Sequence, residues 1–215
     1  MKKNLSTIEF YSGTKSFSKV MKRHGNQTLT IDNDPGLLPD IVANVLDLHG
    51  GYFNEHMRPD ILWASPPCQG FSVAVIGRNW NHDNTPKTES ARLAMKLAQK
   101  TLELIKDIEP RYWFIENPRG KMRKMPFMEE FLTSMGGVRH TISYCQYGDN
   151  RQKPTDIWTN AMWWHPKPLC KPGAPCHEAA PRGSRTGTQG LGNAKDRGRI
   201  PSAVFEEILR QYPHD

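Results

Sequence analysis

The chain has 215 residues, 37% of them hydrophobic and 24% charged, which is enough for one domain with a buried core. No apolar run approaches the roughly 18 residues of a membrane span, and four scattered cysteines are too few for a disulfide framework, so neither an integral membrane protein nor a disulfide-stapled secreted domain is expected. A formal net charge of +7 favours nucleic acid as a partner, although many proteins are this basic for solubility alone. With no signal peptide at the N-terminus, we expect a cytoplasmic protein.

Short apolar runs alternate with helical patterns along the chain. The sequence predicts strands at 7–11, 28–32 and 60–64 and a helix at 16–24. A long helix should begin after Thr88, a good N-cap residue, and end before Pro110. The remaining predicted elements are a strand in RYWFIEN, a helix at 128–135, strands at 141–144 and 156–158 and a closing helix at 202–210. This order is typical of an α/β fold with a mostly parallel, doubly wound sheet and helices on both faces.

Ligands of such sheets bind beyond the carboxyl ends of the strands, so the residues there are the first candidates for function. Five successive segments end in polar or reactive groups, namely YSGTKSF, DND, LDLH, SPPCQGFS and ENPRG. The first two resemble a nucleoside-binding half, in which Gly13 lets backbone approach a ligand and Asp32 binds ribose hydroxyls. Only one glycine stands where dinucleotide folds carry three, so an ordinary strand-to-helix turn is the competing interpretation.

Cys68 follows two prolines, which fix the backbone and remove hydrogen-bond donors just before the thiol. Glu116 leaves the next long strand in a similar way, within ENP. Parallel strands would bring the carboxyl group beside the thiol. A small buried cysteine and a surface acid are the simpler interpretations of each residue taken alone.

Together, ILWASPPCQGFS and FIENPRG resemble the catalytic motifs of the DNA cytosine-5 methyltransferases. The resemblance implies an S-adenosylmethionine-dependent methyltransferase (Rossmann-like) fold. It also implies that Cys68 adds to cytosine C6, and that Glu116 holds and protonates N3, so that C5 becomes nucleophilic. Relatives that methylate exocyclic amino groups have an aromatic residue in place of the cysteine. The loop at 69–87 matches the loop that closes over a flipped base.

The same resemblance assigns the cofactor site. EFYSGTKSF occupies the place of a Phe-x-Gly-x-Gly loop, with Lys15 replacing the second glycine. That replacement puts close backbone approach at Lys15 in question. The implied cofactor-binding residues are Tyr11, Ser12, Gly13, Thr14, Ser16, Asp32, Asn33, Asp47, Leu48, Pro67 and Asn193.

One departure from the family pattern lies in YGDNRQKPTDIW. Where the family carries Gln-x-Arg-x-Arg, this chain has Arg151, Lys153 and Thr155. Thr155 has no guanidinium for the cytosine O2, so Arg151 and Lys153 become the candidate catalytic cations. Because Thr155 replaces an arginine of the family pattern, it also stays open that this protein is a relative without catalytic activity.

The second departure is size. We expect a catalytic domain at 1–158, a short basic, Pro- and Gly-rich insert at 159–191 in place of a larger target-recognition domain, and a C-terminal return at 192–215. The insert holds His165, Cys170, Cys176 and His177, a set that could bind zinc. It has no Cys-x-x-Cys pair, so ordinary thiols in a loop are the simpler interpretation, and Trp163 and Trp164 could stack on bases or form a small core.

The sequence therefore predicts a small enzyme that methylates C5 of cytosine in duplex DNA by base flipping, of the kind found as a phage orphan or in restriction-modification. Three alternatives stay open: the same chemistry on a tRNA-like RNA, a non-catalytic cofactor- or DNA-binding relative, and a chain that needs a recognition subunit.

Overall fold

The computed structural model describes residues 4–54, 58–171, 173–178 and 194–213. Within them a seven-stranded sheet has the order β3-β2-β1-β4-β5-β7-β6. The strands are β1 (Ser6–Phe10), β2 (Gln27–Asp32), β3 (Ile41–Val42), β4 (Ile61–Ala64), β5 (Tyr112–Pro118), β6 (Val138–Ser143) and β7 (Pro154–Thr159). The first five pair in parallel, and β7 runs antiparallel to both β5 and β6. This arrangement confirms the predicted mostly parallel sheet of a Rossmann-like methyltransferase fold.

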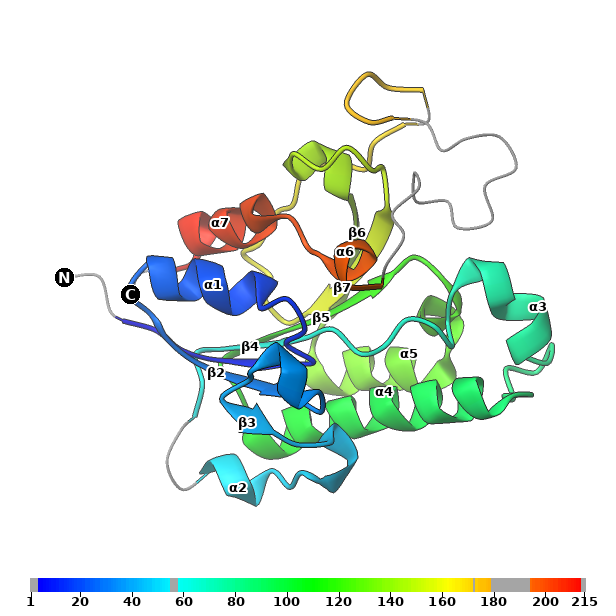
Figure 1. Cartoon of the computed structure of the whole chain (residues 1–215), viewed down its shortest axis with the longest axis horizontal. Helices are drawn as coiled ribbons and strands as arrows, with labels where there is room; N and C mark the ends of the chain where they lie inside the picture. Colours follow the sequence, from blue (N-terminus) through cyan, green and yellow to red (C-terminus); the bar gives the residue numbers. More distant parts are fainter. Residues whose placement is uncertain (1–3, 55–57, 172, 179–193, 214–215) are drawn as a thin grey trace.

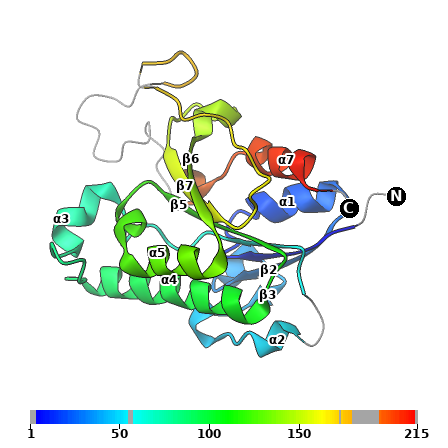
Figure 2. The same ribbon diagram turned by 180° about the vertical axis from the view of Figure 1, so that it is seen from behind.

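Helices cover both faces of the sheet (Figure 1). One face carries α1 (Ser16–Arg23) and α7 (Ser202–Gln211), and the other carries α2 (Gly51–Asn54), α4 (Glu89–Ile108) and α5 (Pro126–Met135), as the reverse view also shows (Figure 2). Short elements complete the chain: α3 (Ile76–Asn79), α6 (Ala194–Gly198) and the 3-10 turns η1 (Pro35–Leu37), η2 (Val45–Asp47), η3 (Val73–Val75), η4 (Lys121–Lys124) and η5 (Tyr144–Tyr147).

Both faces of the central strands are buried, which explains why these strands read as continuous apolar runs. In β4, Leu62 and Ala64 belong to the core under α4, whereas Ile61 and Trp63 belong to the core under α1 and α7. Trp63 stacks on Phe17 of α1 at 5.7 Å between ring centroids. Packing against helices on both faces therefore fixes the position of the sheet and of its strand ends.

Helix α4 forms as the sequence predicts. The Thr88 hydroxyl accepts a hydrogen bond from the backbone N–H of Ala91 at 3.2 Å and so caps the first turn. At the other end Glu109 takes a left-handed conformation, with φ of 50°, just before Pro110 prevents further helix.

The third strand differs from the prediction. Strand β3 has only two residues and ends at Val42, so LDLH does not end a strand. Asp47 instead closes the 3-10 turn η2, which Asn44 caps by accepting from the N–H of Leu46 at 3.0 Å. A two-residue edge strand leaves too short a hydrophobic run to be detected in sequence.

The tryptophans at the start of the insert belong to the core and do not form a base-stacking surface. Trp164 is fully buried and meets Phe114 edge to face at 5.7 Å between centroids. Trp163 meets Tyr112 of β5 at 5.1 Å and Tyr212 at 5.6 Å. None of the described helices combines the length and the apolar composition that crossing a bilayer demands.

Candidate active site

Cys68 lies in the loop that follows β4, and this loop is tied to the end of β5. Asn117, the residue after Glu116, donates from Nδ2 to the carbonyl of Pro66 at 2.9 Å in a buried contact. After the thiol, the N–H of Phe71 closes a turn on the carbonyl of Cys68 at 3.0 Å. Asn117 therefore holds the cysteine loop against the strand that carries the acid.

Two glycines allow this loop to pack tightly. A Cβ on Gly70 would lie 2.3 Å from the Cβ of Ala94 in α4, and a Cβ on Gly120 would lie 2.4 Å from the carbonyl oxygen of Phe71. Side chains at either position would push the loop off its neighbours. The glycines of QGF and PRG thus have a packing role.

The segment at 69–87 is ordered against the same loop. The indole N–H of Trp80 donates to the carbonyl of Gly70 at 2.7 Å, and its ring stacks on Phe71 at 5.4 Å between centroids. An isolated bridge pairs Trp80 with Pro86. In this structure Trp80 therefore packs the segment against Gly70 and Phe71, near the start of the same segment.

Glu116 is buried at the end of β5 and has a defined partner. Its Oε1 accepts a hydrogen bond from the hydroxyl of Tyr144 at 2.8 Å, and Tyr144 is itself fully buried in η5. Burial raises the pKa of the Glu116 carboxyl, while the positive charge of Lys153 opposes that rise. The position therefore favours a carboxylic acid that retains its proton more readily than a surface glutamate does.

Lys153 is the cation of this site. Its ammonium donates to the carbonyl of Arg197 at 2.8 Å and lies over the Tyr144 ring, 4.6 Å from the centroid. Burial lowers the pKa of Lys153, and the charge of Glu116 raises it again. Burial also raises the pKa of the Cys68 thiol, with Glu116 acting in the same direction and Lys153 against it. These shifts couple the thiol, the acid and the ammonium electrostatically.

Arg151, the second predicted cation, is engaged elsewhere. Its buried guanidinium pairs with Asp149 and donates to the carbonyls of Asp196, Arg197 and Arg199 at 3.2–3.3 Å. These contacts hold the segment leading to α7, and the assignment of Arg151 to the catalytic group stays a prediction. Thr155 is fully buried in β7 and donates to the carbonyl of Lys153 at 3.0 Å.

On the cofactor side, Asp32 ends β2 with both carboxylate oxygens in use. One oxygen accepts from the N–H of Gly13 at 2.8 Å and the other from the N–H of Asp34 at 3.0 Å. Each carboxylate oxygen has a second lone pair, so ribose hydroxyls can still bind. The Gly13 contact ties the predicted cofactor loop to the predicted ribose-binding acid.

The loop at 11–15 takes unusual backbone conformations. Lys15 has φ of 57° and ψ of 42°, a left-handed conformation that favours glycine, and Tyr11 also has φ of 57°. The Lys15 ammonium donates to the carbonyl of Leu38. The buried hydroxyl of Ser12 has no hydrogen-bond partner among the described residues, and Thr14 bonds Ser16 at 2.8 Å between hydroxyls.

The other predicted cofactor residues fall into three groups. Asn33 and Asp47 are exposed beyond β2 and in η2, and Leu48 is buried beside Asp47. Pro67 is half-buried next to the thiol, whereas Asn193 lies outside the described residues. Tyr11 points its hydroxyl away from this loop, to the Thr101 hydroxyl of α4 at 2.9 Å.

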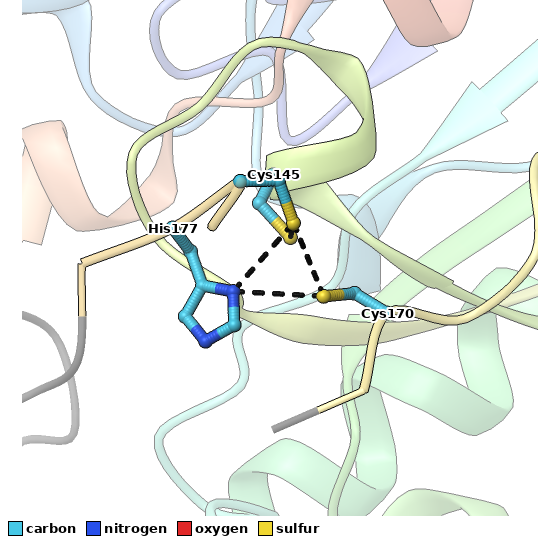
Figure 3. A group of neighbouring side chains, drawn as sticks. Cys145, Cys170 and His177 are labelled. Carbon is cyan, nitrogen blue, oxygen red and sulfur yellow. Dashed lines mark hydrogen bonds between the residues drawn. The ribbon is translucent and has the colours of Figure 1, made fainter. Parts of the chain in front are cut away.

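The structure brings part of the predicted zinc set together. Cys170, Cys176 and His177 converge, but the fourth member is Cys145 of η5, and Figure 3 shows Cys145, Cys170 and His177 turned toward one another. The backbone N–H of His165 instead bonds Gln211 of α7 at 2.8 Å. Cys145 lies far away in sequence, so only the fold reveals it.

Comparison with known proteins agrees with this geometry. The family model described as C-5 cytosine-specific DNA methylase matches residues 43–138, a range that contains both Cys68 and Glu116. A "Probable DNA (cytosine-5)-methyltransferase" of Frog virus 3 is 29% identical over 94% of this chain and 97% of its own length. Over these ranges the chain is similar to DNA cytosine-5 methyltransferases. The viral relative is matched almost end to end.

Solved structures support the fold assignment. An Entamoeba histolytica methyltransferase, EhMeth, superposes with a TM-score of 0.57 at 15% identity over 78% of the present chain and 57% of its own. The S. pombe Dnmt2 methyltransferase gives a TM-score of 0.53 at 17% identity, over 73% and 50% respectively. The chain thus spans little more than half the length of these solved proteins.

Two residues of the site were missed by sequence reasoning. Tyr144 is the last residue of the strand predicted at 141–144, and nothing local indicates its bond to Glu116. Asn117 stands inside the ENP motif, yet its bond to Pro66 becomes visible only when β4 and β5 are paired.

Proposed function

We propose that this protein transfers a methyl group from S-adenosylmethionine to C5 of cytosine in DNA, with Cys68 as nucleophile and Glu116 as acid. The observation that carries the proposal is the connection between the two loops. The Asn117–Pro66 hydrogen bond joins the end of β5 to the cysteine loop. Glu116 raises the pKa of the Cys68 thiol, and Lys153 lowers the pKa of both groups.

The residues have distinct parts in this reaction. The Cys68 thiolate forms a bond to C6 of a flipped cytosine, while Glu116 gives its proton to N3. The Tyr144 hydroxyl donates to Oε1 of the acid and helps to orient the carboxyl group. After methylation C5 loses its proton to a water molecule, and the electron pair of that C–H bond restores the C5–C6 double bond as the Cys68 thiolate leaves C6. N3 then returns its proton to Glu116.

Lys153 promotes the first step electrostatically. Its ammonium opposes the increase in the Cys68 pKa that burial and Glu116 cause, so it raises the fraction of thiolate. Arg151 acts indirectly, because it holds the carbonyl of Arg197, to which Lys153 also donates.

The residues at the ends of β1 and β2 fit the cofactor. Asp32 has free lone pairs for ribose hydroxyls, and the unpartnered Ser12 hydroxyl can bond the methionine end. Lys15 stands at the position of the second glycine of the family motif and adopts a left-handed backbone conformation there. When bound, S-adenosylmethionine supplies the electrophilic methyl group.

DNA is the proposed substrate, since the family model describes DNA methylases and the chain carries a net charge of +7. In this proposal the catalytic domain at 1–158 presents the site, and the insert at 159–191 replaces a larger recognition domain. The C-terminal return at 192–215 contributes α7, whose Phe205 packs against Phe17 of α1.

The test is transfer of labelled methyl groups from S-adenosylmethionine to mixed-sequence duplex DNA, with tRNA in a parallel arm. We expect 5-methylcytosine in DNA and none with Cys68→Ala. Labelling of tRNA alone would reassign the substrate to RNA. Binding of S-adenosylmethionine without transfer to either would indicate a non-catalytic relative or one half of a complex.

A further inference from the structure

The soft ligands outside the active site form one compact group. The cysteine cluster consists of Cys145, Cys170, Cys176 and His177, whose ligand atoms all lie within 4.8 Å of one another (Figure 3). The three sulfurs and one imidazole nitrogen come from two separate parts of the chain, η5 and the insert. The reaction proposed above uses none of these side chains.

The distances within the cluster match the edges of a metal tetrahedron. Zinc holds sulfur at about 2.3 Å and nitrogen at about 2.05 Å, which places two sulfurs about 3.8 Å apart and sulfur and nitrogen about 3.6 Å apart. Here Cys170 Sγ lies 3.2 Å from Cys176 Sγ, and Cys176 Sγ lies 3.5 Å from Cys145 Sγ. The His177 Nδ1 lies 3.5 Å from Cys170 Sγ and 3.7 Å from Cys176 Sγ.

The local backbone favours such a site. Between the two insert cysteines the N–H of Ala174 bonds the carbonyl of Lys171 at 3.3 Å, and Gly173 takes φ of 79°, a left-handed conformation suited to glycine. This turn brings Cys170 and Cys176 together. The amide of Gln146 also donates from Nε2 to Cys176 Sγ at 3.4 Å, as outer-sphere donors do to metal-bound thiolates.

The segment that holds the cluster is attached to β6 and the β6–β7 connection by a few hydrogen bonds. The N–H of Cys170 donates to the Ser143 hydroxyl at 3.1 Å, Gln152 Nε2 donates to the carbonyl of Cys170 at 3.2 Å, and the N–H of Glu178 donates to the carbonyl of Asn150 at 2.9 Å. A segment this short has no core of its own, so a metal is an effective way to stabilise it.

We propose that Cys145, Cys170, Cys176 and His177 bind one structural zinc ion. Three thiolates and an imidazole are a ligand set of structural zinc sites, in which all four positions are protein ligands. The ion would fasten the insert to η5, next to Tyr144, the partner of Glu116. The proposal does not rest on methyl transfer, since it concerns metal content alone.

The test is metal content of the full-length chain, purified under reducing conditions with zinc supplied and measured by elemental mass spectrometry. We expect one zinc per chain in the wild type and in Cys68→Ser, the control for a cysteine outside the cluster. We expect Cys145→Ser and Cys176→Ser to lose the metal, whereas His177→Cys, which keeps four soft ligands, retains it.

Two further measurements protect this test against misfolding. Cobalt added to the metal-free wild type should give the ligand-field and thiolate charge-transfer bands of a tetrahedral site, and His177→Cys should give them with shifted energies. The intact mass should show all four cysteines reduced. A wild type without stoichiometric metal, a Cys170–Cys176 disulfide in the intact mass, or zinc retained in both serine variants would overturn the proposal.

Discussion

The hydroxyl of Tyr144 donates to Oε1 of Glu116 at 2.8 Å, and both side chains are buried between η5 and the end of β5. This bond restricts the orientation of the Glu116 carboxyl group. A second tyrosine of the same turn makes the same kind of bond outside the site, from Tyr147 to Oε1 of Glu207 at 2.7 Å. Comparing variants of Tyr144 and Tyr147 therefore distinguishes a role in catalysis from a role in stability.

Tyr144→Phe should lower methyl transfer by about 10-fold or more. Losing this buried hydrogen bond costs about 1–3 kcal/mol and leaves the Glu116 carboxyl less well oriented. The matched control is Tyr147→Phe, which removes an equally buried tyrosine–carboxylate bond. We expect both variants to melt at lower temperature and only Tyr144→Phe to lose activity at temperatures where both are folded. Equal activity losses in the two would make the Tyr144 bond merely structural.

Lys153→Gln should shift the ionisation of Cys68 to higher pH. The ammonium lowers the pKa of the thiol, so its removal takes away the largest effect that opposes burial and the Glu116 charge, and the thiolate forms at higher pH. Alkylation of Cys68 by iodoacetamide, followed across pH by peptide mass spectrometry, measures this midpoint. Lys153→Arg keeps the charge and should stay near the wild type, while Glu116→Gln should move the midpoint down. A midpoint unaffected by Lys153→Gln would contradict the coupling.

Gly70→Ala should destabilise the cysteine loop by about 1–3 kcal/mol, since its new Cβ would meet the Ala94 Cβ at 2.3 Å. Gly77→Ala is the control, because the same addition meets nothing within 4 Å. Thermal unfolding should separate the two variants, with only Gly70→Ala melting earlier. Similar melting temperatures would show that the loop moves aside freely.

Asp32→Asn should weaken binding of S-adenosylmethionine by about 10-fold. The amide keeps only one of the two carboxylate oxygens, so one acceptor for the loop N–H groups or for the ribose hydroxyls is lost. Asp34→Asn removes the same charge two residues away, where the carboxylate is exposed and accepts only from the N–H of Gly36 at 2.8 Å. Calorimetric titration should therefore show near wild-type affinity for Asp34→Asn. Comparable weakening in both would reduce the effect to net charge, and unchanged affinity in Asp32→Asn would remove Asp32 from the site.

The mostly parallel sheet and the two loops that carry Cys68 and Glu116 were predictable because they depend on local patterns. Apolar runs followed by PPC and ENP mark the carboxyl ends of β4 and β5, and parallel pairing brings such ends together. The start of α4 at Thr88 followed from capping chemistry. These features need no knowledge of distant residues.

The features that escaped prediction all depend on distant partners. Arg151 was predicted as a catalytic cation, but its contacts with the backbone at 196–199 could not be foreseen from YGDNRQKPT. Cys145 replaces His165 in the cysteine cluster because the insert folds back on η5. Lys15 also could not be predicted, because it adopts a left-handed backbone conformation that favours glycine.

The central claim is that Cys68 bonds to cytosine in DNA, and trapping the bond tests it most directly. With 5-fluorocytosine in mixed-sequence duplex DNA, C5 carries no proton to lose after methylation, so the adduct should persist. In the presence of S-adenosylmethionine we predict a protein–DNA species that survives denaturation, with the modification on the Cys68 peptide and no such species from Cys68→Ala. An adduct on another cysteine, or methylation of ordinary DNA by Cys68→Ala, would contradict the account.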